Sequence, residues 1–196
     1  MLHEKALILK VDAYTVHDNI ENGEVRIECK VHDGKTGEGQ VIQGKGVGVV
    51  DAFFHALIDL YSTEFPSLNT IRFSDFTIRG DLHTGRATAK SDSEAMASLK
   101  VANSGNLEFE FVQSSPSSTR ASILVVLAAT EFFINCEQAF IQVYKALRYA
   151  REENRQDSVS QYTRQLTTLV EATSYSEVIE QIKKEESLGH DPFTKE

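Results

Sequence analysis

The stretch QGKGVGVVDAFFHAL, residues 43 to 57, marks a change from the period of a strand to the period of a helix. Upstream, EVRIECKV at residues 24 to 31 alternates apolar and charged residues, as a strand with one wet face does. Downstream, apolar residues recur at helical spacing until Pro66 interrupts the pattern. We therefore expect a sheet that leads through a glycine turn, with Gly46 and Gly48, into a helix that ends at the proline.

The strand pattern extends in both directions from this point. Alternating segments from Ala6 onward are separated by Asn-Gly and Asp-Gly pairs, which favour tight turns between antiparallel strands. Three further strand patterns, NTIRFSDFTIRG, EAMASLKVAN and NLEFEFVQ, precede a helical pattern at 119–153. The order of elements is thus βββα twice, an internal duplication. It predicts an α+β fold of two units, about 5–66 and 68–153, in which a helix covers each three-stranded antiparallel meander.

The long second helix and the residues after it have patterns of their own. The first half of the helix is apolar on nearly all sides, so we expect it to be fully buried, in part by a partner chain. Residues 154–196 are interpreted as a helical tail. Ser158 with Gln161, and Ser174 with Glu177, have the spacing of a capping box, which predicts two short amphipathic helices.

Composition limits the kind of protein this is. The 196 residues carry a formal net charge of -9, which argues against a nucleic-acid partner because phosphate neutralisation needs a basic surface. The N-terminus lacks the layout of a signal peptide, and the most apolar stretch, ASILVVLAATEFFINC, is shorter than the roughly 20 residues that span a bilayer. We expect a cytoplasmic protein that binds no membrane, with Cys29 and Cys136 as reduced thiols.

The glycines before the first helix leave two interpretations open. Neither a P-loop nor a Rossmann fingerprint fits, because no Ser or Thr follows Lys45 and the glycines are evenly spaced after a meander. Either the glycines only make a turn, or the unpaired N–H groups of the helix start bind an anion such as a carboxylate. The six histidines lack metal-ligand spacing, and the serines at 114–118 lack a nucleophile elbow. We therefore expect no metal site, no cofactor and no catalytic residue.

Three segments in this order, GKGVGVVDAFFHAL, LNTIRFSDFTIRG and TRASILVVLAATEFFIN, resemble the C-terminal regulatory domain of alpha-isopropylmalate synthases and citramalate synthases. In that family the first helix follows a G-x-G-P-x-D-A pattern. The chain matches it with Gly46, Gly48, Asp51 and Ala52, and Val49 stands where the family has proline. The further matches are Asp75, followed by Phe76 in place of tyrosine, Ala121-Ser122 at the start of the second helix, and Asn135 within it.

The resemblance implies a function. Domains of this family dimerise and bind leucine or isoleucine, the end products of their pathways, between the two units near the helix starts. The ligand-binding residues that the resemblance implies are Val50, Asp51, Phe73, Phe76, Gly80, Ser115, Pro116 and Ser117. A chain of 196 residues has no room for the family's catalytic barrel of roughly 250 residues. The resemblance therefore implies a non-catalytic homodimer that senses a small branched amino acid or related acid, either for a separately encoded synthase or for another partner.

The chain also departs from the family. The segment GDLHTGRATAKSDSEA is longer than the usual connection and lacks its Gly-x-Asp-Ala pattern. Such departures leave a second hypothesis, a structural dimerisation or adaptor protein whose ligand pocket has decayed. An enzyme with an unrecognised site is the third hypothesis, and it requires convergent polar groups in a cleft.

Overall fold

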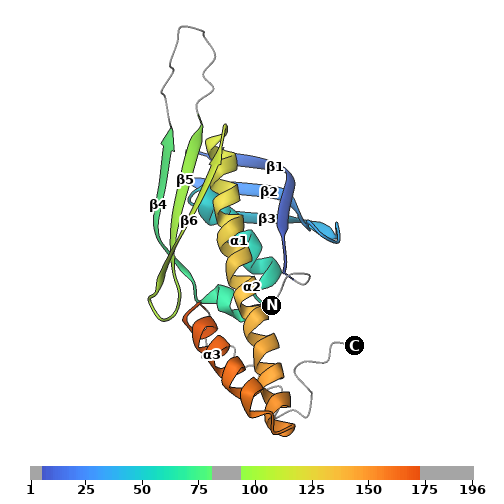
Figure 1. The fold of residues 1–196 in the computed structure, drawn as a ribbon. Coiled ribbons are helices and arrows are strands. Elements are labelled where there is room, and N and C mark those ends of the chain that lie inside the picture. Colours follow the sequence, from blue (N-terminus) through green and yellow to red (C-terminus); the bar gives the residue numbers. More distant parts are fainter. Residues whose placement is uncertain (1–5, 81–93, 173–196) are drawn as a thin grey trace.

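The computed structural model describes residues 6–80 and 94–172, which form two three-stranded antiparallel sheets and their helices (Figure 1). The first unit consists of β1 (Leu9–Asn19), β2 (Glu24–Asp33), β3 (Gly39–Gly46) and α1 (Val49–Tyr61). A short 3-10 helix, η1 (Pro66–Asn69), leads to the second unit, which consists of β4 (Arg72–Gly80), β5 (Ala95–Ala102), β6 (Glu108–Ser115) and α2 (Ser118–Glu152). The last described helix is α3 (Gln156–Ala172). The predicted α+β fold of two βββα units is confirmed.

The strand order within each sheet follows the chain, β1-β2-β3 and β4-β5-β6, as consecutive hairpins require. The Asn-Gly pair forms the first turn, where Gly23 has a φ of 66°. The Asp-Gly pair lies in the next loop, where the left-handed residue is Gly37 (φ 73°). In the β5–β6 loop it is Asn106 (φ 60°), an amino acid type that tolerates this conformation.

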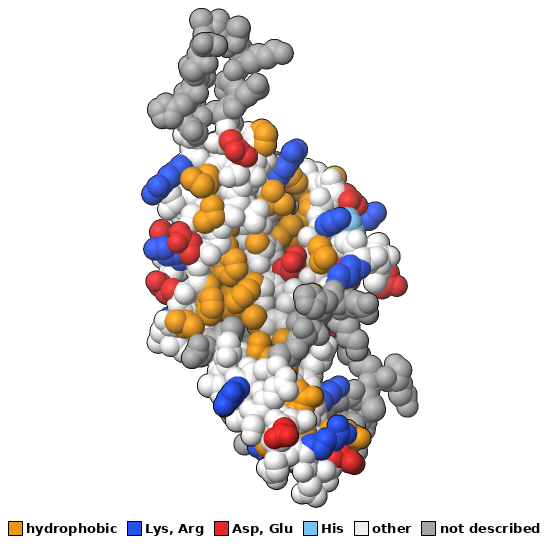
Figure 2. Space-filling model, in the orientation of Figure 1, with side chains coloured by type: hydrophobic (Ala, Val, Ile, Leu, Met, Phe, Trp, Pro, Cys, Tyr) orange, Lys and Arg blue, Asp and Glu red, His pale blue; other side chains and the backbone are white. Residues whose placement is uncertain are grey.

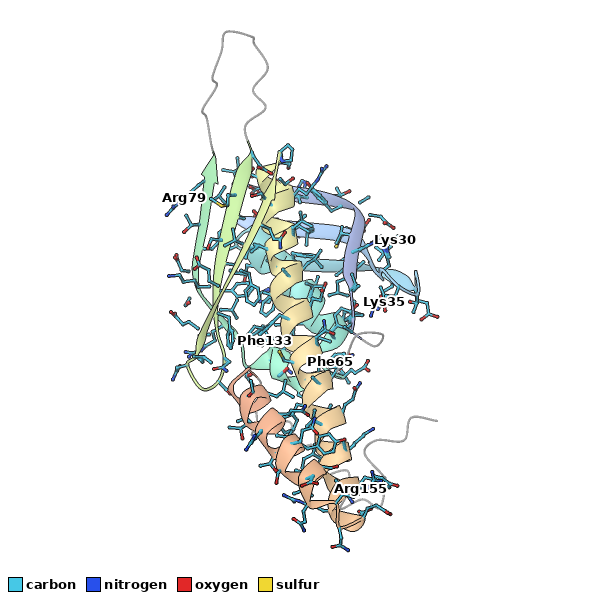
Figure 3. All side chains as sticks on the ribbon, in the orientation of Figure 1. Lys30, Lys35, Phe65, Arg79, Phe133 and Arg155 are labelled. Carbon is cyan, nitrogen blue, oxygen red and sulfur yellow. The ribbon has the colours of Figure 1, made fainter. Side chains whose placement is uncertain are left out.

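One hydrophobic core joins the two units. The predicted inward face of β2, Val25, Ile27, Cys29 and Val31, is at most 4% exposed. Phe133 of α2 and Phe65 beside η1 lie in the centre of the molecule, whereas Arg79 and Lys30 lie at its periphery (Figure 3).

The helix α2 packs along β5 and β6 on one side, and it also contacts α1 and β1 (Figure 1). Its first half is largely buried as predicted, but residues of the same chain do most of the covering. The burial therefore does not need a partner chain. Within the described residues, α2 is the one helix long and apolar enough to cross a membrane, and 61% of its apolar window is buried inside the protein. Core helices of soluble proteins meet the same criterion.

Two polar side chains of α2 hold the beginning of the first strand. Asn135 Oδ1 accepts a hydrogen bond from the N–H of Leu7 at 2.8 Å, and Asn135 Nδ2 donates to the Leu7 carbonyl at 3.0 Å. One turn earlier, Glu131 Oε2 accepts from the N–H of Leu9 at 3.0 Å. Burial raises the pKa of Glu131, while the hydrogen bond from Leu9 opposes the rise. Asn135, which was matched to the family on sequence alone, thus bonds both backbone groups of Leu7 with its side-chain amide, as a neighbouring strand would.

A buried carboxylate connects α2 to the segment between the units. Glu137 is 1% exposed, and its Oε2 accepts hydrogen bonds from the backbone N–H of Ser67 at 3.1 Å and from the Ser67 hydroxyl. Burial raises the pKa of Glu137, the two hydrogen bonds from Ser67 lower it, and the charge of Glu64 adds to the rise. This contact fixes η1, and with it the lead into β4, against the middle of α2.

Two predicted helix boundaries differ from the structure. The helix α1 ends at Tyr61, before Pro66, which starts η1 instead. The predicted cap at Ser158 is wrong, because α3 already begins at Gln156. The cause is a tight reversal of the chain, in which Asn154 has a φ of 54° and the backbone N–H of Arg155 donates to the Ala150 carbonyl at 2.9 Å. The helix predicted from the Ser174 and Glu177 spacing lies outside the described residues.

Candidate functional site

The glycine turn between β3 and α1 is built for close approach of strand and helix. A Cβ atom on Gly44 would collide with the Ala52 carbonyl of α1, and one on Gly46 would collide with the Asp51 carboxylate. Side chains at these two positions would push the helix off the strand. Gly48 is the N-cap of α1 with extended backbone, and a Cβ there would meet open space. The predicted turn glycines therefore differ, since Gly46 is needed for packing and Gly48 is not.

Asp51 and His55, one turn apart on α1, hold the turn together. Asp51 Oδ2 accepts a hydrogen bond from the N–H of Val47 at 3.0 Å, and Asp51 Oδ1 lies 3.6 Å from His55 Nε2. His55 Nδ1 lies 2.8 Å from the carbonyl of Lys45, so the tautomer protonated at Nδ1 donates to it. The residue that the resemblance assigns to ligand binding thus already has a local structural contact.

The other predicted ligand residues fall into separate groups. Gly80 and Ser115 flank Ala95 in one row across the second sheet, and Pro116 and Ser117 follow at the start of α2. Ser117 caps that helix by accepting a hydrogen bond from the N–H of Arg120 at 3.3 Å. These residues gather at one end of the sheet.

Phe73 lies at the opposite end of β4, seven residues from Gly80 in sequence, which corresponds to roughly 20 Å of strand. Its ring packs on Phe54 of α1 with centroids 4.4 Å apart. Phe76 lies between the two ends and is 37% exposed, while Val50 packs partly buried against the core. A ligand the size of leucine does not reach from Phe73 to Gly80, so no single small site contains the whole set.

A cavity of about 680 Å³ lies beside the glycine turn, on the first sheet. Register places two rows of side chains on one face of that sheet, Thr15-Glu28-Gln43 and His17-Arg26-Lys45. The remaining lining residues are Ile27 and Gly44 from the strands and His55, Ile58 and Asp59 from α1. This volume is within the usual range for small-molecule sites, about 300–1,000 Å³.

The charged groups of the cavity are of both signs. Arg26 and Lys45 are directly opposite each other on β2 and β3, so their positive charges lie close together. Arg26 Nε bonds Glu24 Oε1 at 2.6 Å, and this hydrogen bond is the main reason that the pKa of Glu24 is lowered. Gln43 Nε2 donates to Glu28 Oε2 at 2.6 Å in the neighbouring row. Asp59 adds a second carboxylate from α1.

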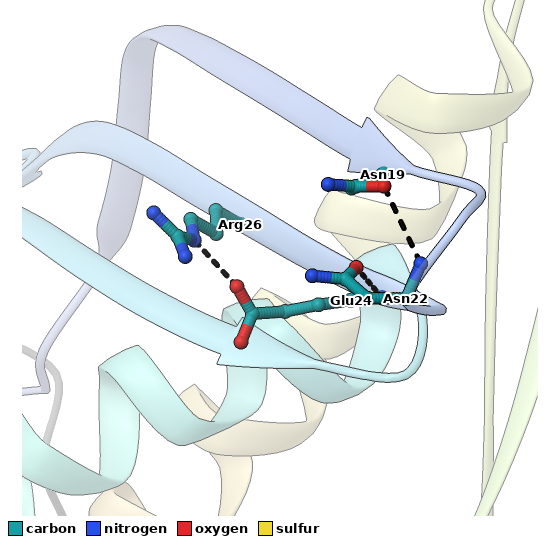
Figure 4. A network of polar contacts seen from close by, with 4 residues as sticks. All are labelled: Asn19, Asn22, Glu24 and Arg26. Carbon is teal, nitrogen blue, oxygen red and sulfur yellow. Dashed lines mark hydrogen bonds and ion pairs between the residues drawn. The ribbon is translucent and has the colours of Figure 1, made fainter.

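The hairpin next to the cavity is itself fixed by side chains (Figure 4). Asn19 Oδ1 accepts from the N–H of Asn22, and Asn22 Oδ1 accepts from the N–H of Glu24, at 3.4 and 3.0 Å. Glu24 in turn holds Arg26. The network orients the guanidinium at the rim of the cavity.

Sequence patterns identified the turn beside this cavity but not its polar rows. Residues such as Glu28 and Lys45 alternate with the buried face of their strands, a pattern that is also typical of ordinary solvated charges. The missing information is the register between strands, which depends on the loops at Gly23 and Gly37. The alternation of each strand, taken together with the lengths of the two loops, would predict which polar side chains share a row across the sheet.

Metal and thiol chemistry find no support in residues 6–80 and 94–172. No group of three His, Cys, Asp or Glu side chains in these ranges is placed to hold a metal ion. Cys29 and Cys136 are free thiols, and burial raises the pKa of each to about 11. Both therefore stay protonated at neutral pH and are weak nucleophiles.

No protein-family model matches this chain, and no curated protein matches it.

Proposed function

We propose that this protein is a non-catalytic, cytoplasmic regulatory module that binds a small branched amino acid or a related acid as a homodimer. In this proposal it acts on a separately encoded synthase, as the resemblance to the regulatory domain of alpha-isopropylmalate synthases implies. The observation that carries the proposal is the cavity beside α1, which combines paired cationic groups, separate carboxylates and an aliphatic wall.

The chemistry of an amino acid matches these three elements. The carboxylate of the ligand binds Arg26 and Lys45, and charge-assisted hydrogen bonds of this kind are the strong ones in proteins. Its ammonium group faces Glu28 and Asp59. The branched side chain packs on Ile58 of α1. Along each strand the two rows are two residues, or roughly 7 Å, apart. Long side chains from both rows can therefore contact one small zwitterion that lies between them.

A thermal-shift screen of the full chain against leucine, isoleucine, valine and their 2-oxo acids tests this proposal. A ligand that binds the native state raises the midpoint of unfolding in a concentration-dependent way. We expect Lys45→Met to weaken binding at least about tenfold, since a hydrogen bond to a charged group contributes about 1.5–3 kcal/mol. Lys30→Met is the matched control, because Lys30 lies on β2 but does not line the cavity. No response to any of these compounds at millimolar concentration would rule out the sensing function.

A structural dimerisation or adaptor protein is the second candidate, and it too has an observation in its favour. Three of the residues implied by the resemblance already have local partners: Asp51 accepts a hydrogen bond from the N–H of Val47, Ser115 Oγ accepts one from the N–H of Ser117 at 3.3 Å, and the ring of Phe73 packs on that of Phe54. A stable dimer with no ligand response in the same screen supports this candidate over the first.

A further inference from the structure

The strand β4 forms an open edge of the second sheet. Within the described residues it pairs with β5 alone, so the backbone groups on its other side have no neighbouring strand. Its ladder with β5 shifts register between Phe73 and Asp75 and is regular from there to Gly80. An open edge of this kind is a template for pairing with another chain, which many proteins prevent with charged side chains, proline or bulges.

The face of β4 that it shares with the core has apolar surface left to bury. Phe76 and Ile78 lie opposite Leu99 and Ala97 of β5, which are both buried. Phe76 is nevertheless 37% exposed and Ile78 is 43% exposed, because α2 packs mainly along β5 and β6. A further apolar neighbour on the open side of β4 would cover both side chains.

The opposite face of β4 carries charges of both signs. Asp75 and Arg79 lie on this face, two residues before and two residues after Thr77. Acidic and basic side chains both lie along the left side of Figure 2, where the second sheet stands, whereas hydrophobic side chains gather over β6 and α2. The segment DFTIR, residues 75 to 79, is therefore self-complementary about its central threonine.

We propose that two copies of this chain pair through β4, antiparallel and centred on Thr77. The inference rests on the homodimer of the proposed function and names the surface through which the two copies meet. In this register Asp75 of each copy lies opposite Arg79 of the other, and Phe76 of each lies opposite Ile78 of the other. Opposite charges and apolar side chains that face each other across two strands both stabilise the pairing.

The pairing continues the rows that each sheet already has. On the charged face the signs alternate across the joint, in the order Glu110, Lys100, Asp75 and then Arg79 of the second copy. On the other face the apolar row through Phe76 continues into the second copy. The two second sheets become one continuous sheet, and both copies of α2 lie on the same side of it.

The other edge of the second sheet lacks this self-complementarity. The strand β6 carries Glu108 and Glu110 and no basic residue, so no antiparallel register of two β6 strands brings opposite charges together. Like charges that lie opposite each other weaken strand pairing. Charge therefore selects β4 over β6 as the edge through which the copies meet.

A charge exchange on β4 tests the pairing in the full chain. Sedimentation equilibrium measures the dissociation constant of the dimer. Arg79→Asp places two carboxylates opposite each other at both ends of the pairing, and it should raise this constant at least about tenfold. Adding Asp75→Arg makes the charges opposite again and should recover most of the loss. Lys30→Asp, on the other side of the molecule in Figure 3, makes the same charge change and should leave the constant unaltered.

A disulfide trap tests the register and does not depend on the stability of the charge variants. Directly opposite residues of antiparallel strands have Cα atoms about 4.5–5.5 Å apart, and a disulfide spans roughly 4.4–6.8 Å. Thr77→Cys should therefore form a covalent dimer in oxidised glutathione. Ser114→Cys, at an exposed position of β6, should not. Circular dichroism checks that every variant is folded.

The outcomes separate this interface from the rest of the proposed function. A wild-type dimer that Arg79→Asp does not weaken, or that Thr77→Cys does not trap, overturns pairing through β4 and leaves the homodimer standing. A loss that the second charge change does not recover also overturns it. A wild type that is monomeric at every concentration overturns the homodimer as well, while the thermal-shift screen decides ligand binding separately.

Discussion

Replacing the buried Glu137 by glutamine should remove a specific part of the dependence of stability on pH. The carboxylate is 1% exposed, and its hydrogen-bond donors are the N–H and hydroxyl of Ser67. Burial, the largest cause, raises its pKa above the ordinary value of 4.5, so the folded protein binds this proton more tightly than the unfolded chain does. The cost of the buried charge is absent below pH 4.5 and complete above the folded pKa.

The sign of the effect follows from that difference in proton binding. As pH rises from 4.5 through the folded pKa, the free energy of unfolding of the wild type should fall relative to that of Glu137→Gln. At neutral pH the glutamine variant should be within about 1 kcal/mol of the wild type, because its amide oxygen still accepts a hydrogen bond from Ser67. Glu137→Ala should lose about 3 kcal/mol, since it leaves two buried donors without an acceptor.

Urea unfolding followed by circular dichroism, at several pH values and with a constant m-value, measures these differences. The free energy of unfolding of the Gln variant is subtracted from that of the wild type at each pH. This difference cancels the contributions of the other carboxyl groups, including Glu131. A difference that stays constant with pH, or one that grows in favour of the wild type as pH rises, would show that Glu137 is not destabilised by its buried charge.

The remaining predictions concern the turn and the strand clamp. Gly44→Ala should lower the free energy of unfolding by about 2 kcal/mol or more, because its Cβ would meet the backbone of α1. Gly48→Ala should change it by no more than about 0.5 kcal/mol, because a Cβ there meets open space. Thermal melts compare the two variants, and equal losses of stability would contradict the packing role of the turn. Asn135→Ala should cost about 1–2 kcal/mol and speed hydrogen exchange at the N–H of Leu7. Unchanged exchange at Leu7 would show that the side chain does not hold the strand.

Local patterns in the sequence were sufficient for the elements of the fold. Alternation in β2 correctly placed Val25 and Ile27 in the core, and the break at residues 43 to 57 correctly separated strand from helix. These features depend on neighbours in the sequence. The start of α3 could not be predicted in the same way, because it is set by the left-handed Asn154 in a three-residue reversal.

Long-range packing explains what the sequence left open. The apolar first half of α2 suggested a second chain, but both units of one chain supply most of the cover, and only the tertiary arrangement reveals this. Likewise Arg26 and Lys45 are nineteen residues apart and become neighbours through register alone. The polar face of a strand carries no sign of whether a cavity or bulk water lies above it.

The location of a bound amino acid is the most direct test of the central proposal. Titration of leucine into the 15N-labelled protein, followed by amide chemical shifts, locates the ligand without any substitution. We expect the largest shifts at the amides of Ile27, Gly44 and His55, around the cavity on the first sheet. Shifts confined to Gly80, Ser115 and Ser117 would place the ligand at the start of α2 instead, and an unchanged spectrum would contradict amino-acid binding altogether.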